Sequence, residues 1–160
     1  MNRYGRWREC LLAACLVITL PSYAGERLDD SASPRSRVEA PQAIEIPDTT
    51  QVVLKFGQVD YKLATANFVG KQARIDYVIP ASIPGLVSPN GLLVEWRGNA
   101  PFESGTGRPG DRVLVWTGIV SEAWMSTRLD LTMQVDLAAL RLPSGVPFGF
   151  ESYFEIEVLP

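Results

Sequence analysis

The clearest pattern in the chain is a strict alternation of apolar and polar side chains from Thr127 to Leu137. From position 129 the odd-numbered residues are apolar, whereas the even-numbered residues are charged or polar. A period of two places successive side chains on opposite faces, so this segment predicts a β-strand with one buried and one solvated face. The same alternation recurs near the C-terminus, over residues 148–158.

Shorter segments of the same kind predict further strands over residues 51–56, 59–63, 73–79 and 92–97. Residues 112–120 are apolar at both odd- and even-numbered positions, which predicts a central strand covered on both faces. Only Gly57 separates the first two strands, and residues 138–142 fit one helical turn. We therefore predict an all-β fold of about seven strands, an antiparallel two-sheet sandwich of immunoglobulin-like or related Greek-key type.

The first 24 residues have the organisation of a secretory signal peptide. Three arginines precede an apolar run from Leu11 to Leu20, and small residues at Ser22 and Ala24 precede the expected cleavage point. The apolar run has about half of the ~20 residues that span a bilayer, so we expect cleavage after Ala24 rather than a retained anchor. The predicted location is secreted or periplasmic.

An alternative interpretation of the leader is a lipoprotein signal. Leu12, Ala13 and Ala14 before Cys15 resemble a lipobox, in which the cysteine is lipidated and becomes the first residue. The apolar run before Cys15 is short, and apolar residues continue beyond it as far as Leu20. We therefore favour cleavage after Ala24 and keep lipidation as the minor alternative.

Loss of the leader changes the chemistry that is available to the mature chain. Both cysteines, Cys10 and Cys15, lie in the leader, and the sequence has no histidine. This composition excludes cysteine nucleophiles, Ser-His-Asp triads and His/Cys metal sites. The leader also removes three of the 15 basic and one of the 18 acidic residues, which leaves a net charge of −5. An acidic domain of this kind favours neither nucleic acid nor anionic lipid.

Residues 25–50 are polar and contain several prolines, so we predict a flexible tail before a packed domain over residues 51–160. One alternating stretch within this tail is apolar at Val38, Ala40, Ile44 and Ile46. Such a stretch is a candidate donor strand for the open sheet edge of a neighbouring subunit. Pro41 counts against this hypothesis, because proline lacks the N–H that a complete strand ladder needs.

Two long connections, over residues 80–91 and 98–111, are rich in glycine and proline. Loops of this length are often functional, and their alternative role is to cross between the two sheets. Candidate ligand or partner contacts in the second loop are Phe102, Glu103, Arg108 and Asp111. The glycines at 105, 107 and 110 precede a predicted strand rather than a helix, which argues against a phosphate-binding loop.

Trp124 is the tryptophan most suited to binding, because it lies between two predicted strands where a large side chain is at least partly exposed. Trp96 and Trp116 lie on predicted strands and are expected in the core. Trp124 is therefore a further candidate for contact with a partner or a sugar, against the alternative of core or interface packing.

An enzyme of this composition would depend on carboxylates or on a serine–lysine pair. Glu95, Glu103, Asp111, Asp130 and Asp136 are the acidic candidates, but nothing in the sequence pairs them as a glycosidase requires. Calcium held by Asp111, Glu103 and loop carbonyls is chemically feasible, although the spacing matches no known ligand pattern. We predict no catalytic residues, no metal and no other cofactor.

These observations favour an exported, non-enzymatic β-sandwich that acts as an interaction or structural module of the cell envelope or surface. Its expected partner is a protein of an envelope or surface assembly, as for adhesin-like or pilus-like subunits. The alternative is a glycan- or small-ligand-binding domain that uses the long loops and Trp124. A carboxylate-based hydrolase ranks below both hypotheses.

Overall fold

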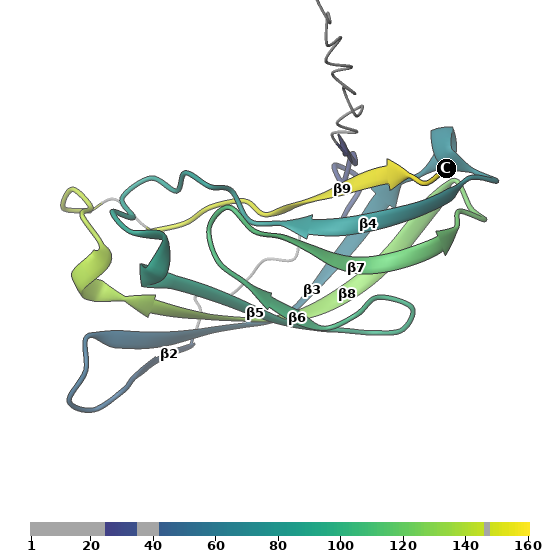
Figure 1. The fold of residues 1–160 in the computed structure, drawn as a ribbon. Coiled ribbons are helices and arrows are strands. Elements are labelled where there is room, and N and C mark those ends of the chain that lie inside the picture. The colour runs from purple at the N-terminus through teal and green to yellow at the C-terminus, as the bar shows by residue number, and fades with distance from the viewer. Residues whose placement is uncertain (1–24, 35–41, 146–147) are drawn as a thin grey trace, which may run out of the picture.

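A computed structural model describes residues 25–34, 42–145 and 148–160 and confirms the two-sheet antiparallel sandwich (Figure 1). Sheet A contains, in spatial order, β1 (Glu26–Arg27), β9 (Tyr153–Val158), β4 (Gln72–Val78) and β7 (Arg112–Ile119). Sheet B contains β2 (Gln42–Glu45), β3 (Gln51–Ala64), β8 (Trp124–Asp136), β5 (Leu92–Gly98) and β6 (Gly105–Gly107). Three short 3-10 turns are η1 (Ala66–Phe68), η2 (Pro89–Gly91) and η3 (Leu137–Ala139).

The alternating segments form strands as predicted, with the expected faces inward. In β8, Leu129, Leu131 and Val135 are buried, whereas Arg128 and Asp130 are exposed. The predicted C-terminal strand is shorter than its pattern, because only residues 153–158 pair in β9. The helical turn expected over residues 138–142 is the 3-10 turn η3, which begins one residue earlier.

The two strands predicted on either side of Gly57 are one strand, β3, with a bulge at that glycine. Its pairing with β8 skips one residue between Lys55 and Gly57. Gly57 has a φ of 72°, a left-handed conformation that glycine adopts without steric cost. The separation that we expected from a turn is therefore a local irregularity within one 14-residue strand.

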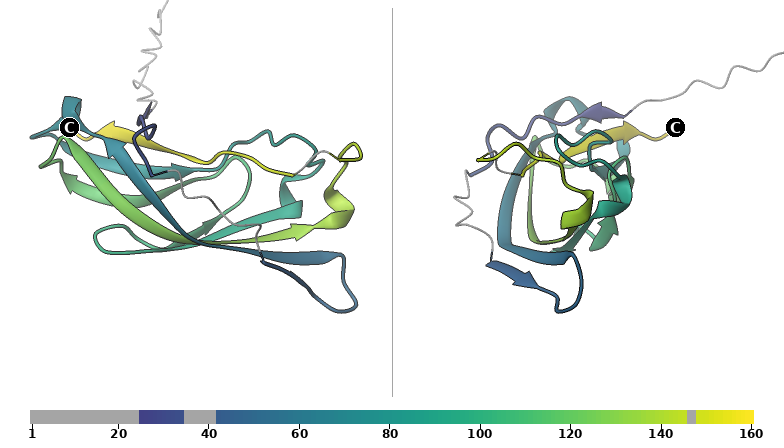
Figure 2. Two further views of the ribbon diagram at one scale, coloured as in Figure 1. Left: turned by 180° about the vertical axis from the view of Figure 1, so that it is seen from behind. Right: turned by 90° about the vertical axis from the view of Figure 1, so that its left-hand side faces the viewer.

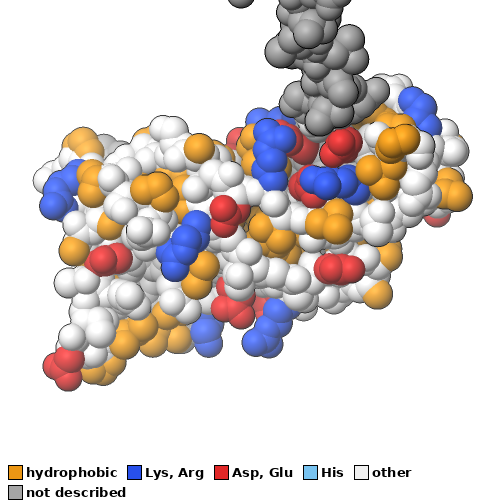
Figure 3. Space-filling view, viewed as in Figure 1, with side chains coloured by type: hydrophobic (Ala, Val, Ile, Leu, Met, Phe, Trp, Pro, Cys, Tyr) orange, Lys and Arg blue, Asp and Glu red, His pale blue; other side chains and the backbone are white. Residues whose placement is uncertain are grey.

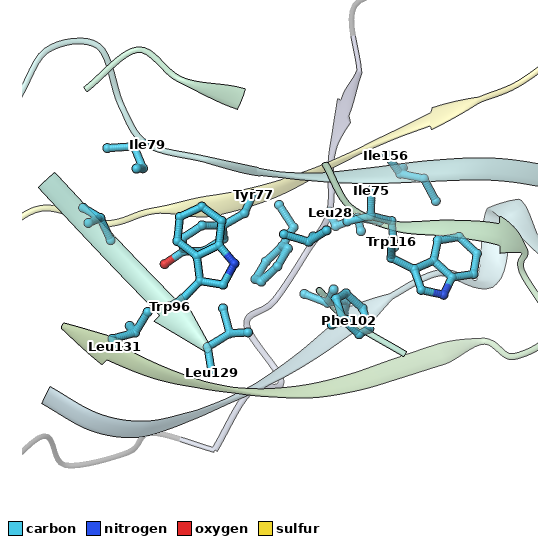
Figure 4. Packing of buried hydrophobic residues seen from close by; sticks show 14 of the residues in the cluster. Leu28, Ile75, Tyr77, Ile79, Trp96, Phe102, Trp116, Leu129, Leu131 and Ile156 are labelled. Carbon is cyan, nitrogen blue, oxygen red and sulfur yellow. The ribbon is translucent and has the colours of Figure 1, made fainter. Parts of the chain in front are cut away.

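The core lies between the sheets and is centred on aromatic side chains (Figure 4). Tyr77 from β4 faces Trp96 from β5, with ring centroids 4.8 Å apart in an edge-to-face arrangement. Phe154 from β9 contacts Tyr77 at 5.0 Å. Burial raises the pKa of Tyr77 well above its ordinary value, so its hydroxyl stays neutral and forms a hydrogen bond with Ser152. Trp96 and Trp116 are both buried, as predicted.

The sandwich begins before residue 51, which differs from the expectation of a flexible tail over residues 25–50. β1 pairs with β9, and Leu28 is only 2% exposed. The segment then passes to the other sheet. There the carbonyl of Asp29 accepts a hydrogen bond from the N–H of Ala64, and the hydroxyl of Ser33 accepts one from the N–H of Lys62. Residues 25–34 therefore close one side of the sandwich, as the end-on view shows (Figure 2).

The predicted signal peptide lies outside the described residues, as do Cys10 and Cys15. Cleavage after Ala24 and lipidation of Cys15 therefore remain predictions. In the part of the chain that the structure covers, no helix has the length and apolar character needed to cross a bilayer.

Candidate functional site

The open edges of the two sheets are the first place to look for a binding surface, because an edge strand presents unpaired backbone N–H and C=O groups. Three of the four edge strands in the described residues are short: β1 has two residues, β6 three and β2 four. The fourth, β7, has eight. Natural β-sandwiches commonly prevent pairing with other chains by keeping their edge strands short, and β7 is longer than the other three edge strands.

The position of β7 corrects the sequence prediction of a central strand covered on both faces. Among the described strands β7 pairs only with β4. Its register shifts between Trp116 and Leu114, so Val115 forms a bulge. Val113 and Val115 face inward before the bulge, and Trp116 and Gly118 face inward after it. The change of parity at a bulge explains why the segment is apolar at both odd and even positions.

The outward side chains of β7 include two large apolar residues. Leu114 is 44% exposed and Ile119 is 64% exposed. Val69, in the turn that precedes β4, is 48% exposed and lies near the end of β7, because the next residue, Gly70, donates to the carbonyl of Val120. β7 therefore combines an open backbone edge with exposed apolar side chains.

Only part of the β7 edge is covered by the loop that follows β5. The N–H of Glu103 donates to the carbonyl of Val115 at 2.8 Å, which occupies the edge at the bulge. Beyond the bulge, Gln72 of β4 is the register partner of Ile119 of β7. The carbonyl of Gln72 nevertheless accepts from the N–H of Leu159 and so points away from β7. Because alternate residues of an antiparallel strand bond to opposite sides, Thr117 and Ile119 direct their backbone groups to the open edge. No described residue pairs with this side of β7 there.

The comparisons with known proteins found no match, either to a family model or to a curated protein or solved structure.

The candidate contacts in the loop over residues 98–111 have mainly structural surroundings. Phe102 is 3% exposed and packs 6.4 Å from Phe154, so its side chain belongs to the core rather than to a surface. The burial of Phe102 was not predictable from an alternation of apolar and polar residues, because the loop around it is not periodic. Glu103 has an exposed side chain, and its backbone carbonyl accepts from Nε1 of Trp96 at 3.2 Å.

Arg108 and Asp111 bring the two long loops together. Nη1 of Arg108 donates to the carbonyls of Asn90 at 3.0 Å and Leu92 at 3.4 Å. The carboxylate of Asp111 accepts from the N–H of Arg108 at 2.7 Å, which closes a tight turn. These contacts stabilise the crossover from β6 to β7 and occupy Nη1 of Arg108.

Trp124 is the aromatic contact candidate that the structure places on the surface. Its side chain is 41% exposed, whereas Trp96 is 1% exposed, as expected from the sequence. Trp124 begins β8 rather than lying between strands, and the ammonium of Lys62 lies 4.9 Å from its ring centroid. One face of the indole is therefore occupied by a cation–π contact.

A hollow of about 550 Å³ lies on the same part of the molecule as Trp124. Its lining includes Lys62 and the ion pair between Asp60 and Arg128, whose Oδ1 and Nε atoms are 2.6 Å apart. The hydrogen bond from Arg128 lowers the pKa of Asp60. The hollow is open, and two of its charged side chains, Asp60 and Arg128, are paired with each other.

The candidate donor segment is only partly described. Val38 and Ala40 lie outside the described residues. Ile44 lies in β2 and pairs with Val53 of the same chain, and its side chain is 40% exposed. Ile46 follows β2, in a hairpin that extends beyond the body of the sandwich (Figure 1). The described part of the segment therefore occupies the β3 edge of its own chain.

The acidic candidates do not converge on a catalytic pair. Glu95 and Asp130 lie on the outer face of sheet B, around a hollow of about 240 Å³ that Lys55 and Arg97 also line. Asp136 caps η3, because its carboxylate accepts from the N–H of Ala138 at 2.9 Å. Within residues 25–34, 42–145 and 148–160, no three acidic side chains gather closely enough to hold a metal ion.

The outer face of sheet A carries an ion-pair network that sequence reasoning did not single out (Figure 3). Arg74 pairs with Asp76 at 2.8 Å and with Glu157 at 3.3 Å, and Arg112 pairs with Glu155 at 2.6 Å. The alternation of the C-terminal segment did place Glu155 and Glu157 on the solvated face. The neighbouring strands that supply the arginines were not predictable from that pattern.

Proposed function

We propose that this protein is an exported, non-enzymatic interaction module that binds an extended segment of a partner protein along the open edge of β7. The observation that carries the proposal is the eight-residue length of this edge strand, with Thr117 and Ile119 directed outward beyond the bulge. A partner strand would add to sheet A through backbone hydrogen bonds, which give affinity in β-augmentation.

The chemistry of the edge favours a protein partner over a charged ligand. Leu114 and Ile119 offer apolar contacts on the outward face, and burial of apolar surface contributes about 25 cal/mol per Å². Alternate side chains of an added strand would contact these residues while its backbone pairs with Thr117. An envelope or surface assembly remains the proposed setting, because the leader predicts export.

Two variants test the edge by different physical means. Thr117→Pro removes an N–H that is directed to the open side of β7, so it should block strand addition and leave the backbone pairing with β4, although it also removes the hydrogen bond from the Thr117 hydroxyl to the carbonyl of Ala73. Ile119→Lys places a charge on the edge, which is a common natural means of preventing strand addition. Val87→Lys is the matched control, because Val87 is 61% exposed in the connection between β4 and β5, away from this edge.

The measurement is cross-linking of the tagged protein in the exporting cell, followed by mass spectrometry of the linked proteins. We expect one or more partners that are linked to the wild type and to Val87→Lys and lost from both edge variants. Equal linkage of every partner to all four proteins would contradict the proposal. Sedimentation velocity of the same proteins tells whether the partner is a second copy of this chain.

Glycan binding is the second candidate, and the exposed ring of Trp124 is the observation that favours it. Sugars stack on aromatic faces, and the neighbouring hollow offers polar groups from Lys62 and Arg128. Trp124→Ala should abolish glycan binding and leave the β7 contact unchanged. Retention of glycan binding by this variant would remove the second candidate.

A further inference from the structure

The ion-pair network on the outer face of sheet A is short of positive charge. It joins two guanidinium groups, Arg74 and Arg112, to three carboxylates, Asp76, Glu155 and Glu157. The side chains of Asp76 and Glu155 are only 9% exposed. An uncompensated carboxylate at such low exposure is costly, because burial removes most of its hydration.

Three buried polar atoms of this network lack a hydrogen-bond partner, namely Nε of Arg74 and one carboxylate oxygen each of Asp76 and Glu155. Oδ1 of Asp76 and Oε2 of Glu155 are buried, and neither receives a hydrogen bond from a described residue. Oε2 of Glu155 is close to Nη1 of Arg112, at 2.6 Å, but the arrangement lacks the angles of a hydrogen bond. The site therefore has capacity for a further donor, and a cationic donor would also correct its charge.

Gly25 immediately precedes β1 and lies beside Glu155. The register of β1 pairs Glu26 with Ile156, which places Gly25 on the same face as Glu155. A Cβ atom built on Gly25 would lie 3.1 Å from Cβ of Glu155 and 3.2 Å from its Oε2. The side of Gly25 on which a side chain would lie therefore faces Glu155.

The predicted cleavage point immediately precedes this residue. Hydrolysis of the Ala24–Gly25 amide consumes one water and leaves a carboxylate on Ala24 and an amine on Gly25, which takes up a proton at neutral pH. We propose that the α-ammonium group created at Gly25 by removal of the leader binds the carboxylate of Glu155. The inference rests on the predicted cleavage point and is independent of the β7 edge.

Binding of this ammonium would have two consequences. It brings the network of two arginines and three carboxylates to electrical balance, and it provides the missing donor at Glu155. It also holds the first residues of β1, a strand of two residues, against β9. Removal of the leader would then be a step that completes the folded domain.

The first test is the N-terminus of the exported protein, read by intact mass. We expect a chain that begins at Gly25, and any other first residue would overturn the proposal. On this protein, selectively labelled at glycine, the α-amine of Gly25 is titrated by NMR. We expect its pKa to be raised above the ordinary value, because a neighbouring carboxylate favours the charged form.

The matched comparison uses Glu155→Gln, with Glu95→Gln on the opposite sheet as its control. The pKa of the Gly25 amine should return to its ordinary value in the first variant and keep its raised value in the second. An unshifted amine in the wild type, or the same raised pKa in Glu155→Gln, would overturn the proposal.

Selective acetylation of the N-terminal amine tests the same contact in a protein whose Glu155 is intact, should Glu155→Gln fail to fold. We expect the acetylated protein to melt at a lower temperature than the free amine form at pH 6–7. An amine whose pKa is raised in the folded state stabilises the folded protein at pH values below the unfolded-state pKa. This stabilisation is lost as the pH rises through the folded-state pKa. The two melting temperatures should therefore converge at alkaline pH, and equal values at pH 6–7 would contradict the contact.

Discussion

Asp136 shows how one polar side chain joins three segments. Its Oδ1 accepts from the hydroxyl of Thr50 at 2.5 Å and from the N–H of Ala138 at 2.9 Å. These hydrogen bonds lower its pKa from the ordinary 3.8, with that from Thr50 as the larger cause. The side chain thereby fastens the β2–β3 hairpin to the turn η3.

Asp136→Asn should lower the stability of the protein at neutral pH, because the amide is a weaker acceptor than the carboxylate. A lowered folded-state pKa gives a contribution that is full above the unfolded value of 3.8 and is lost as the pH falls through the folded pKa. Urea unfolding should therefore separate wild type and variant at pH 7 and bring them together near pH 2. A difference that is constant with pH would contradict the role assigned to this carboxylate.

The bulge in β7 makes neighbouring positions respond in opposite ways to a charge. Val115 is 1% exposed, whereas Leu114 is 44% exposed. Val115→Lys should lower the free energy of unfolding by roughly 3 kcal/mol or more, because it buries an unpaired ammonium. The free energy of unfolding of Leu114→Lys should stay within about 0.5 kcal/mol of that of the wild type. Chemical denaturation measures both, and equal destabilisation would show that β7 is covered on both faces after all.

Gly57 provides a separate test of the bulge in β3. An alanine there would have open space around its Cβ but would retain a φ of 72°, so its effect comes from the backbone alone. Gly57→Ala should lower the free energy of unfolding by about 1 kcal/mol. Gly149→Ala, which also meets nothing within 4 Å and lacks a positive φ, should be nearly neutral when both are compared by thermal unfolding.

The strands that were predictable from sequence are those whose alternation is uninterrupted. The segment around Leu129 and Leu131 gave the correct faces of β8, because period two directly reports burial on one side. The exposure of Leu114 and Ile119 could not be predicted, since a bulge and a doubly covered strand both give apolar residues at odd and even positions. The pairing partner that distinguishes the two is set by long-range contacts.

Isolated residues were the hardest to predict. Leu28 lies among charged residues in the sequence, and it is buried only because β1 pairs with β9 more than a hundred positions away in the chain. Phe102 is buried for a similar reason, in a loop without any period. The candidate site at the β7 edge escaped prediction because its exposure depends on which strand stands last in the sheet.

As a whole molecule, the domain after residue 24 is expected to be stable without a disulfide bond or a metal ion. Its sequence after residue 24 has no cysteine or histidine, and its core unites both sheets around Tyr77 and Trp96. We expect thermal melts that are unchanged within error by a chelator or by a reductant. A marked shift of the melting temperature with the chelator would reveal a bound metal ion and contradict this expectation.

At the scale of the assembly, we propose that a partner occupies the open strand edge of β7. Hydrogen exchange at single amides tests this proposal, first on the protein alone and then on its cross-linked complex. We expect the amides of Thr117 and Ile119 to exchange fast in the free protein, and those of Trp116 and Gly118 to be protected by β4. In the complex, the amides of Thr117 and Ile119 should become protected. Protection of these two amides in the free protein, or their continued fast exchange in the complex, would contradict the proposal.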